Sequence, residues 1–334
     1  MGYDVNVLRR ATARLEENHR LYVEQKRRRR QQVYAARPQL SQLDRGLKRT
    51  MAELIGATLK KGEDTAAVIQ DIRQRNQALQ RERTEILKEL GLTVEELDDG
   101  PMCRSCGDTG WKGASMCQCL KELCKQEQIK ELSKLLSLGE QSFDTFRLDY
   151  YSQVLYPSQG LSPRENMRMV RDFCSKYAQN FGKFHYKNLF LSGAPGLGKT
   201  FLSACIARTV SENGFSVVYD TAGNIFAQFE NRKFQRDVEG VQEARDDTRR
   251  YLTCDLLILD DLGSELTTQF VQTALYELVN TRMVAGKHTV ISSNLTMEEV
   301  GRRYSPQIAS RLEGEYRVLP FFGDDIRVLK KKQI

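Results

Sequence analysis

The stretch GAPGLGKT at residues 193–200 decides the fold of this 334-residue chain. Two glycines separated by four residues and followed by Lys199 and Thr200 are typical of a loop whose backbone N–H groups surround phosphates. Residues 187–192 (KNLFLS) predict a buried strand before the loop, and residues 200–213 predict a helix after it. Because strand, loop and helix follow in this order, we interpret the stretch as a nucleoside-triphosphate site rather than a flexible glycine-rich turn.

A second motif, LLILDDLG at residues 256–263, predicts the metal-holding acids that such a site needs for hydrolysis. Four apolar residues form a buried strand, and Asp260 and Asp261 leave its carboxyl end beside the phosphates. Asp260 is predicted to hold Mg²⁺ together with Thr200, and Asp261 to polarise the attacking water. A strand that merely ends in a turn is the alternative. The residues predicted to bind nucleotide are Gly193, Pro195, Gly196, Gly198, Lys199, Thr200 and Asp260.

Strand and helix patterns alternate through the second half of the chain, which predicts an α/β fold with a parallel sheet covered by helices on both faces. Helical stretches separate the predicted strands. These strands are residues 187–192, 215–221, 255–263, 288–294 and 316–321.

Composition indicates a soluble protein, with 40% hydrophobic and 28% charged residues. No apolar run approaches the roughly 18 to 20 residues of a membrane span, and the first residues lack the apolar core of a signal peptide. We therefore expect a cytoplasmic protein with no membrane partner.

The net charge of +7 is concentrated in residues 1–97, which contain 20 Lys or Arg against 14 Asp or Glu. Apolar residues recur there at helical spacing, and Pro38 suits the first turn of a second helix. This basic helical region reads as a partner-binding domain. Its run KRRRR at 26–30 suits either phosphates or an acidic protein surface, and a solvated helix face remains the alternative.

Cysteines cluster in residues 98–124. Cys103 and Cys106 form a C-x-x-C pair, and Cys117 and Cys119 form a C-x-C pair, so four thiolates suit a structural Zn²⁺ site. Cys124 is an alternative fourth ligand. Disulfides are disfavoured because a cytosolic chain keeps its thiols reduced.

These features divide the chain into four predicted parts: a helical domain, a zinc segment, a linker, and an ATPase domain. Their ranges are 1–97, 98–124, 125–164 and 165–334.

The motifs GAPGLGKT, LLILDDLG and ISSN (291–294) together resemble the ATPase core of the AAA+ class, and within it the bacterial helicase loaders of the DnaC/DnaI family. The cysteine block resembles the zinc segment of the DnaI-like branch. SFDTFRLDYYS at 142–152 resembles the segment before that family's core. The matching segments run through residues 103–312. The resemblance implies ATP, Mg²⁺ and Zn²⁺ as cofactors and a hexameric replicative DNA helicase as the partner of residues 1–97. It also implies single-stranded DNA binding and self-association through the ATPase domain.

The resemblance also assigns catalytic roles. Lys199 and Asp261 would act on the γ-phosphate and the water, Asn294 matches the sensor position, and Arg311 matches the arginine that reaches a neighbouring subunit's site. Arg302 and Arg303 are nearby competitors for that last role.

Two departures from the AAA+ pattern affect the expected activity. Asp261 stands where most members carry Glu, which suggests slow, switch-like hydrolysis. The chain reaches Ile334 soon after Arg311, so we expect no C-terminal lid with its own sensor arginine and a nucleotide affinity that depends on a neighbouring subunit.

Aromatic and basic residues mix in AGNIFAQFENRKFQRD at 222–237. Phe226 and Phe229 have the spacing of a core-facing helix. Arg232, Lys233 and Phe234 are the candidates for contacting single-stranded DNA, with a solvated loop as the alternative. The leading hypothesis is an ATP-regulated helicase loader of the primosome type; an IstB-like transposition helper or a non-hydrolysing ATP-binding zinc scaffold are the alternatives.

Overall fold

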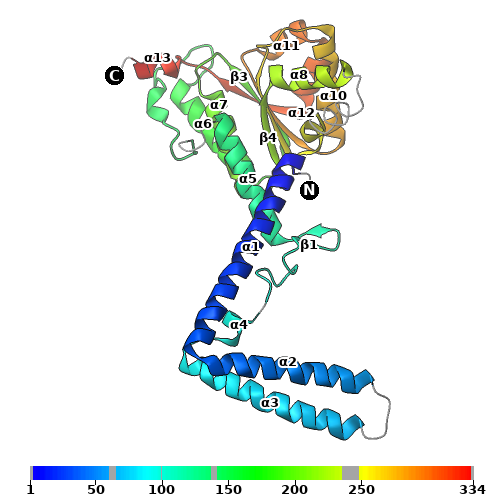
Figure 1. Cartoon of the computed structure of the whole chain (residues 1–334). Helices are drawn as coiled ribbons and strands as arrows, with labels where there is room; N and C mark the ends of the chain where they lie inside the picture. The colour runs from blue at the N-terminus through cyan, green and yellow to red at the C-terminus, as the bar shows by residue number, and fades with distance from the viewer. Residues whose placement is uncertain (1–2, 60–64, 99, 137–140, 235–247, 332–334) are drawn as a thin grey trace. The chain divides into compact units, whose positions relative to one another are not determined.

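The computed structural model describes residues 3–59, 65–98, 100–136, 141–234 and 248–331 (Figure 1). The chain divides into two compact units. One contains Met1–Thr12 with Leu120–Ile334, and the other contains Ala13–Cys119.

The first unit is built on a five-stranded sheet with the order β4-β5-β6-β3-β7, and all of its strand pairs are parallel. The α/β prediction is confirmed, and each predicted strand is present. The strands are β3 (Asn188–Gly193), β4 (Val217–Thr221), β5 (Leu256–Leu262), β6 (His288–Ser293) and β7 (Tyr316–Phe321).

Helices cover both faces of this sheet, because its central strands alternate apolar side chains between two hydrophobic clusters. On one face, Leu189 and Ile258 pack with residues of α6 (Pro163–Gln179) and α7 (Lys199–Glu212). On the other, Phe190 and Leu257 pack with the remaining layer. That layer comprises α8 (Ala222–Phe234), α10 (Gln269–Val284), α11 (Met297–Arg303) and α12 (Pro306–Glu315).

Among the described residues after β7 there is one short helix, α13 (Ile326–Lys331), so no helical lid domain is present there. Residues 125–164, predicted as a linker, contain helical elements. They contain most of α5 (Gln118–Leu136), the 3₁₀ helix η1 (Leu148–Tyr150) and the start of α6. The boundaries at 97/98 and 124/125 stay predictions.

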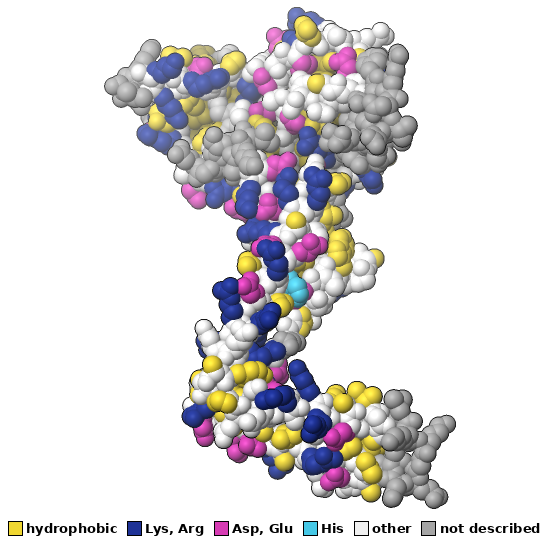
Figure 2. Space-filling model, in the orientation of Figure 1, with side chains coloured by type: hydrophobic (Ala, Val, Ile, Leu, Met, Phe, Trp, Pro, Cys, Tyr) yellow, Lys and Arg dark blue, Asp and Glu magenta, His cyan; other side chains and the backbone are white. Residues whose placement is uncertain are grey.

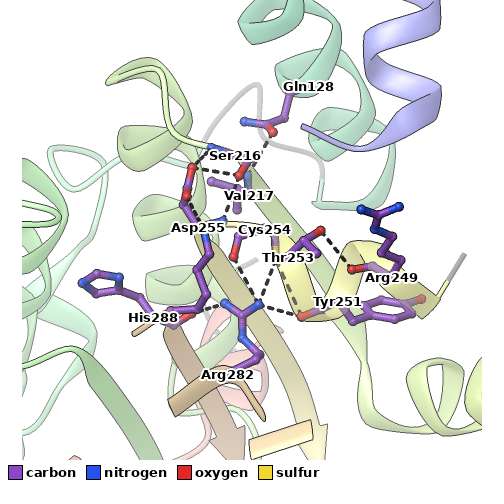
Figure 3. Close-up of polar contacts among 11 residues, drawn as sticks. Gln128, Ser216, Val217, Arg249, Tyr251, Thr253, Cys254, Asp255, Arg282 and His288 are labelled. Carbon is purple, nitrogen blue, oxygen red and sulfur yellow. Dashed lines mark hydrogen bonds and ion pairs between the residues drawn. The ribbon is translucent and has the colours of Figure 1, made fainter. Parts of the chain in front are cut away.

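A wholly buried arginine joins the amino ends of β5 and β6 to α10 (Figure 3). The Arg282 guanidinium donates to the carbonyl oxygens of Tyr251 (2.6 Å), Cys254 (3.2 Å) and His288 (2.6 Å) and to the hydroxyl of Thr289 (3.0 Å). Tyr251, Cys254 and Thr289 are buried, so their acceptor atoms depend on donors from within the protein. The arginine therefore supplies donors to backbone carbonyls at this end of the sheet.

Helix α5 belongs to the same unit through a side chain that binds the edge strand β4 (Figure 3). Gln128 is buried; its Nε2 donates to the Phe215 carbonyl (2.9 Å), and its Oε1 accepts from the Val217 N–H (2.9 Å). The amide thus pairs with an edge whose backbone groups have no neighbouring strand.

The first residues of the chain also pack in this unit. The Tyr3 hydroxyl donates to the Gly214 carbonyl (3.0 Å), and Arg10 pairs with Glu131 of α5 (2.5 Å). These contacts place the first turns of α1 (Val5–Ala36) with the unit that contains the five-stranded sheet rather than with the rest of the helical region.

The second unit is mostly helical, as predicted. Besides most of α1 it contains α2 (Pro38–Leu59), α3 (Thr65–Glu89) and α4 (Val94–Leu97), followed by the short strands β1 (Trp111–Lys112) and β2 (Ser115–Met116). Arg83 is almost fully buried and bonds both Asp44 and Asp98 at 2.6 Å. This ion-pair network connects α2 and α3 to the residue that follows α4.

Candidate functional site

The phosphate loop lies between β3 and α7, where the sequence predicts it. Gly196 and Gly198 have φ angles of +80° and +93°, which L side chains rarely adopt. A Cβ on Gly196 would lie 2.0 Å from the Asp325 carboxylate, and one on Gly193 would lie 2.1 Å from the Phe321 carbonyl oxygen. The glycines therefore let the loop turn tightly, and α7 begins directly at Lys199 with its backbone N–H groups facing a cleft.

That cleft has a volume of about 770 Å³. The predicted residues Pro195, Gly196, Gly198, Lys199 and Thr200 line it together with Asp260, Asp261 and Asn294. Gly193 contributes its carbonyl oxygen to Lys199 instead of lining the cleft.

Lys199 is the buried cation of the cleft, with 7% of its surface exposed. Its ammonium donates to the Gly193 carbonyl (2.5 Å), the Ala194 carbonyl (2.8 Å) and the Asn294 Oδ1 (2.8 Å). Burial lowers its pKa to about 8, while the nearby carboxylates of Asp260 and Asp261 oppose that shift. A triphosphate would supply the compensating negative charge.

Asp260 is buried at the carboxyl end of β5 and accepts three side-chain hydroxyls. These come from Thr200 (3.2 Å), Tyr219 and Ser292. The pairing with Thr200 places one carboxylate and one hydroxyl together, and Mg²⁺ prefers oxygen ligands of this kind. The residue pair therefore fits the predicted metal role. The sequence prediction missed Tyr219, which reaches Asp260 from the neighbouring strand β4.

Asp261 is turned into the cleft by a local irregularity of the sheet. The pairing of β5 with β6 shifts register between Leu259 and Leu262, and Asp261 has a φ angle of +59°. Its N–H donates to the Ser292 hydroxyl (3.0 Å), and its Oδ1 accepts from the Asn294 amide (3.1 Å). Adjacent acids thus face different surroundings, one buried among hydroxyls and one open to the cleft.

Asn294 links the Lys199 ammonium to Asp261, the half-buried acid of the cleft. Its Oδ1 accepts from Lys199 and its Nδ2 donates to Asp261. A side chain that touches both groups would sense a γ-phosphate bound between them, so the arrangement is compatible with the predicted sensor position.

Arg311 lies on α12 and is not among the residues that line this cleft. It contacts Asn280 Oδ1 and lies over the Tyr276 ring, 5.2 Å from the centroid. Of its two predicted competitors, Arg303 donates to the Glu265 carbonyl (2.6 Å) and to Thr267, and Arg302 pairs with Glu298. An arginine that acts in the nucleotide site of a neighbouring subunit must lie outside its own cleft, and Arg311 meets this condition.

Sequence reasoning missed the contribution of the last described helix. Arg327 and Lys330 of α13 line the cleft, and the Ile326 N–H donates to the Gly196 carbonyl (3.1 Å). We expected no lid with its own sensor arginine and did not foresee that Arg327 would line the cleft. The sequence of α13 is only six residues long, and nothing in it predicts that this helix packs against the phosphate loop.

The four predicted zinc ligands come together in the second unit. The Sγ atoms of Cys103, Cys106, Cys117 and Cys119 all lie within 4.8 Å of one another. Cys124, the alternative ligand, is fully buried in the other unit. Four thiols at this spacing fit a tetrahedral, closed Zn²⁺ site of structural type.

Hydrogen bonds from protein groups hold the loop around these four cysteines in place. Asp108, at a φ of +65°, accepts the N–H groups of Met102 (2.9 Å) and Cys103 (2.6 Å) and pairs with His19 of α1 (2.8 Å). The Cys119 N–H lowers the pKa of the Cys117 thiol to about 6, whereas burial and the neighbouring thiols raise the pKa of Cys119. The first shift favours the thiolate form that binds metal, and the second opposes it.

Replacing Cys106 with Ser is expected to remove about one equivalent of Zn²⁺ per chain, because three thiolates and a hydroxyl no longer make a closed tetrahedral site. Metal analysis of the purified wild type and variant measures this. Cys124→Ser is the matched control and keeps its zinc. Equal zinc content in wild type and Cys106→Ser would contradict the four-cysteine assignment.

The predicted DNA-contacting residues lie in the last turn of α8 rather than in a following loop. Arg232 and Lys233 are exposed; Arg232 donates to Thr248 (3.3 Å), and the Lys233 ammonium lies 5.2 Å from the Phe270 ring centroid. The side chain of Phe234 lies outside the described residues. The prediction that Phe226 and Phe229 pack in the core is confirmed.

The basic run at 26–30 is partly engaged within its own unit. Lys26 donates to the Glu95 carbonyl (2.5 Å), Arg28 pairs with Glu24 (2.5 Å), and Arg30 donates to the Leu97 carbonyl (2.8 Å). Figure 2 shows further Lys and Arg side chains along α1. Among the described helices, none has the length and apolar content that crossing a membrane requires.

Comparison with known proteins supports the nucleotide assignment. Residues 174–331 match the family model described as IstB-like ATP binding protein. The chromosomal replication initiator protein DnaA of Caldanaerobacter subterraneus subsp. tengcongensis is 25% identical over 225 residues, which are 64% of this chain and 44% of that protein. The replicative helicase loader DnaC of Escherichia coli (strain K12) is 21% identical over 171 residues, 51% of this chain and 62% of that protein.

The chain thus spans about half the length of the curated relatives it matches. A crystal structure of the DnaC helicase loader is 17% identical, with a TM-score of 0.45 over 56% of this chain and 99% of that one. With its phosphate loop, its paired acids and this family match in one core, the chain has an IstB-like ATP-binding domain at residues 174–331, and this domain is similar to the helicase loader DnaC.

Proposed function

We propose that this protein is an ATP-dependent loader of a replicative DNA helicase that uses slow ATP hydrolysis as a switch. The observation that carries the proposal is the connection of Lys199, Asn294 and Asp261 in one cleft of an IstB-like ATP-binding domain. Such a connection lets the γ-phosphate bias the position of the acid that faces water. A γ-phosphate-dependent switch suits a protein that must hold a partner and then release it.

In this proposal, different residues of the chain bind the phosphates, hold Mg²⁺ and activate the attacking water. The phosphate-loop N–H groups and Lys199 bind the β- and γ-phosphates, and Thr200 with Asp260 would hold Mg²⁺, which neutralises phosphate charge when bound. Asp261 orients and deprotonates the attacking water. Its short side chain reaches less far than a glutamate, which is consistent with slow turnover.

The active site would be completed by self-association. Arg311 lies outside its own cleft, and its guanidinium would neutralise charge on the γ-phosphate of a neighbouring subunit. Arg327 adds a cation from the same chain, so nucleotide binding by a single subunit does not depend on the neighbour alone. ATP would then favour assembly, and hydrolysis would favour its reversal.

The partner assignments follow the same division of the chain. Residues 1–97, basic and helical, would bind a hexameric replicative helicase, as the name of the E. coli relative suggests. Arg232, Lys233 and Phe234 at the end of α8 would contact single-stranded DNA. A cytoplasmic location is part of this proposal.

The proposal is tested with full-length protein, a purified hexameric replicative helicase and a single-stranded oligonucleotide. ATP is expected to support a complex of all three, and Lys199→Ala is expected to weaken it. Glu298→Gln, an exposed change on α11, serves as control. Failure to bind both the helicase and the single strand in the presence of ATP would reject the loader function.

An IstB-like transposition helper is the second candidate, and the description of the matching family model favours it. The clustered cysteines argue for the loader, because they resemble the DnaI-like zinc segment. Copurification with a transposase instead of a helicase would reverse the preference.

Lys199 gives triphosphate binding an expected pH dependence. Its pKa of about 8 in the nucleotide-free protein rises when phosphates bind, so binding takes up a proton above that pH. Affinity for ATP is expected to be flat below about pH 8 and to fall by up to about tenfold per pH unit above it. Calorimetry in two buffers of different ionisation enthalpy measures both affinity and proton uptake. Constant affinity up to about pH 9.5 would contradict a buried, proton-binding Lys199.

A further inference from the structure

Asp260, the acid proposed to hold Mg²⁺, has both of its carboxylate oxygens bonded to protein hydroxyls. Its Oδ2 accepts from Thr200 (3.2 Å) and from Tyr219, and its Oδ1 accepts from Ser292. An ionised carboxylate offers about four lone-pair positions, two on each oxygen. The three hydroxyls come from α7, β4 and β6, and among the described residues they are the only side-chain donors to Asp260. One position, on Oδ1, therefore remains for a further partner.

The three hydroxyls differ in their access to the cleft. Thr200 and Ser292 line the cleft with Asp260, whereas Tyr219 is buried and is not among the lining residues. The Thr200 hydroxyl can donate its proton to Asp260 and still offer its oxygen to a cation. Tyr219 can influence a bound ion only through Asp260. It is therefore a positioning residue and not a ligand.

The donors to the two carboxylate oxygens are themselves held in place. The Ser292 hydroxyl accepts the Asp261 N–H (3.0 Å), so its own proton is directed toward Asp260. Burial, together with the charge of Asp260, raises the pKa of the Tyr219 phenol above its ordinary value, so this group keeps the proton that it donates. Hydrogen bonds to both oxygens restrain the carboxylate from turning about its Cβ–Cγ bond. Asp260 can therefore offer a cation one lone pair of one oxygen.

We propose that Tyr219 makes the site selective for Mg²⁺ over Ca²⁺ by limiting Asp260 to monodentate contact. Mg²⁺ demands a near-ideal octahedron of ligands, in which a carboxylate supplies a single oxygen. Ca²⁺ takes about six to eight ligands in a flexible arrangement and commonly binds both oxygens of a carboxylate. Because Tyr219 and Thr200 fill Oδ2, Asp260 cannot bind Ca²⁺ in this second way. The inference rests on the proposed binding of ATP with Mg²⁺ and adds a residue that selects the ion.

Calorimetry of full-length protein with the non-hydrolysable analogue β,γ-imido-ATP, in Mg²⁺ and in Ca²⁺, tests this role. Tyr219→Phe frees a position on Oδ2 and allows the carboxylate to turn. The affinity in Ca²⁺ is therefore expected to rise relative to that in Mg²⁺, by about tenfold. Ser292→Ala frees the opposite oxygen and should shift the ratio in the same direction.

Tyr304→Phe is the matched control for this experiment. Tyr304 is also buried and also donates to a carboxylate, that of Glu265, but neither residue lines the cleft. The same chemical change there should leave the ratio of the two affinities as it is in the wild type.

The outcomes separate this inference from the proposed function. An unchanged ratio in Tyr219→Phe, with the analogue still bound in Mg²⁺, would overturn the selective role of Tyr219 and leave the ATP site intact. An equal loss of affinity in both ions would overturn it as well, because a merely structural residue acts on both alike. Failure of the wild type to bind the analogue in Mg²⁺ would overturn both proposals. Melting temperatures show whether each variant is folded, and if Tyr219→Phe is not, the ratio in Ser292→Ala decides.

Discussion

Asp261→Asn is expected to lower the rate of ATP hydrolysis by at least about a hundredfold, because an amide cannot accept a proton from water. The backbone of the variant should be preserved. Asp261 has a φ of +59°, and asparagine adopts this region almost as readily as aspartate does. The Asn294 amide can still donate to the new side-chain oxygen, so the affinity for ATP is expected to stay within about threefold of wild type.

Single-turnover hydrolysis and nucleotide binding, measured on the same preparations, test this prediction. Glu298→Gln removes an exposed carboxylate on α11 outside the cleft and should hydrolyse ATP at the wild-type rate. If Asp261→Asn changes neither quantity, the protein is a non-hydrolysing scaffold that uses ATP for assembly. If binding is lost as well, Asp261 holds the nucleotide rather than the water.

Arg282→Met is expected to lower the free energy of unfolding of the unit that contains the five-stranded sheet by about 3 to 5 kcal/mol. The guanidinium is wholly buried and donates to three backbone carbonyls and a threonine hydroxyl. Methionine fills part of the volume but donates to none of them. The acceptors at the amino ends of β5 and β6 then lose the donors that Arg282 supplies, and losing a donor to a buried acceptor is costly.

Hydrogen exchange of β5 and β6 amides, followed by mass spectrometry, measures this loss in the correct unit. Tryptophan fluorescence would not, because Trp111 belongs to the other unit. Arg168→Met, on the exposed side of α6, is the matched control and should change stability by less than about 0.5 kcal/mol. Unchanged exchange in Arg282→Met would show that water replaces the lost donors.

Local patterns in the sequence predicted most of the fold and the phosphate end of the site. The central strands β3, β5 and β6 are runs of largely buried residues, and such runs can be recognised without knowledge of distant partners. Asp260 and Asp261 are recognisable because they follow one of these runs directly. The same holds for the first three helices, whose apolar residues recur at helical spacing.

What the sequence could not predict depends on segments that meet only after folding. Arg327 reaches the cleft because α13 returns to the phosphate loop, and Gln141 does so because residues 141–151 bind that loop from outside the core. Arg282 looks like an ordinary charged residue near a helix end, and nothing local marks it as buried. By spacing, Cys119 is the predicted fourth ligand with Cys124 as its alternative, and only their placement in the structure separates them.

The contacts of the first residues have a consequence for synthesis. Tyr3 binds the Gly214 carbonyl, and Asp4 lies 3.9 Å from Arg250, so both partners are translated more than two hundred residues later. Tyr3 and Asp4 therefore leave the ribosome without their partners and can form these contacts only after residues 214 and 250 have been synthesised. Contacts between such distant positions close late in folding. Pulse proteolysis during translation should thus find the N-terminal tyrosine accessible until the strands after residue 250 have left the exit tunnel.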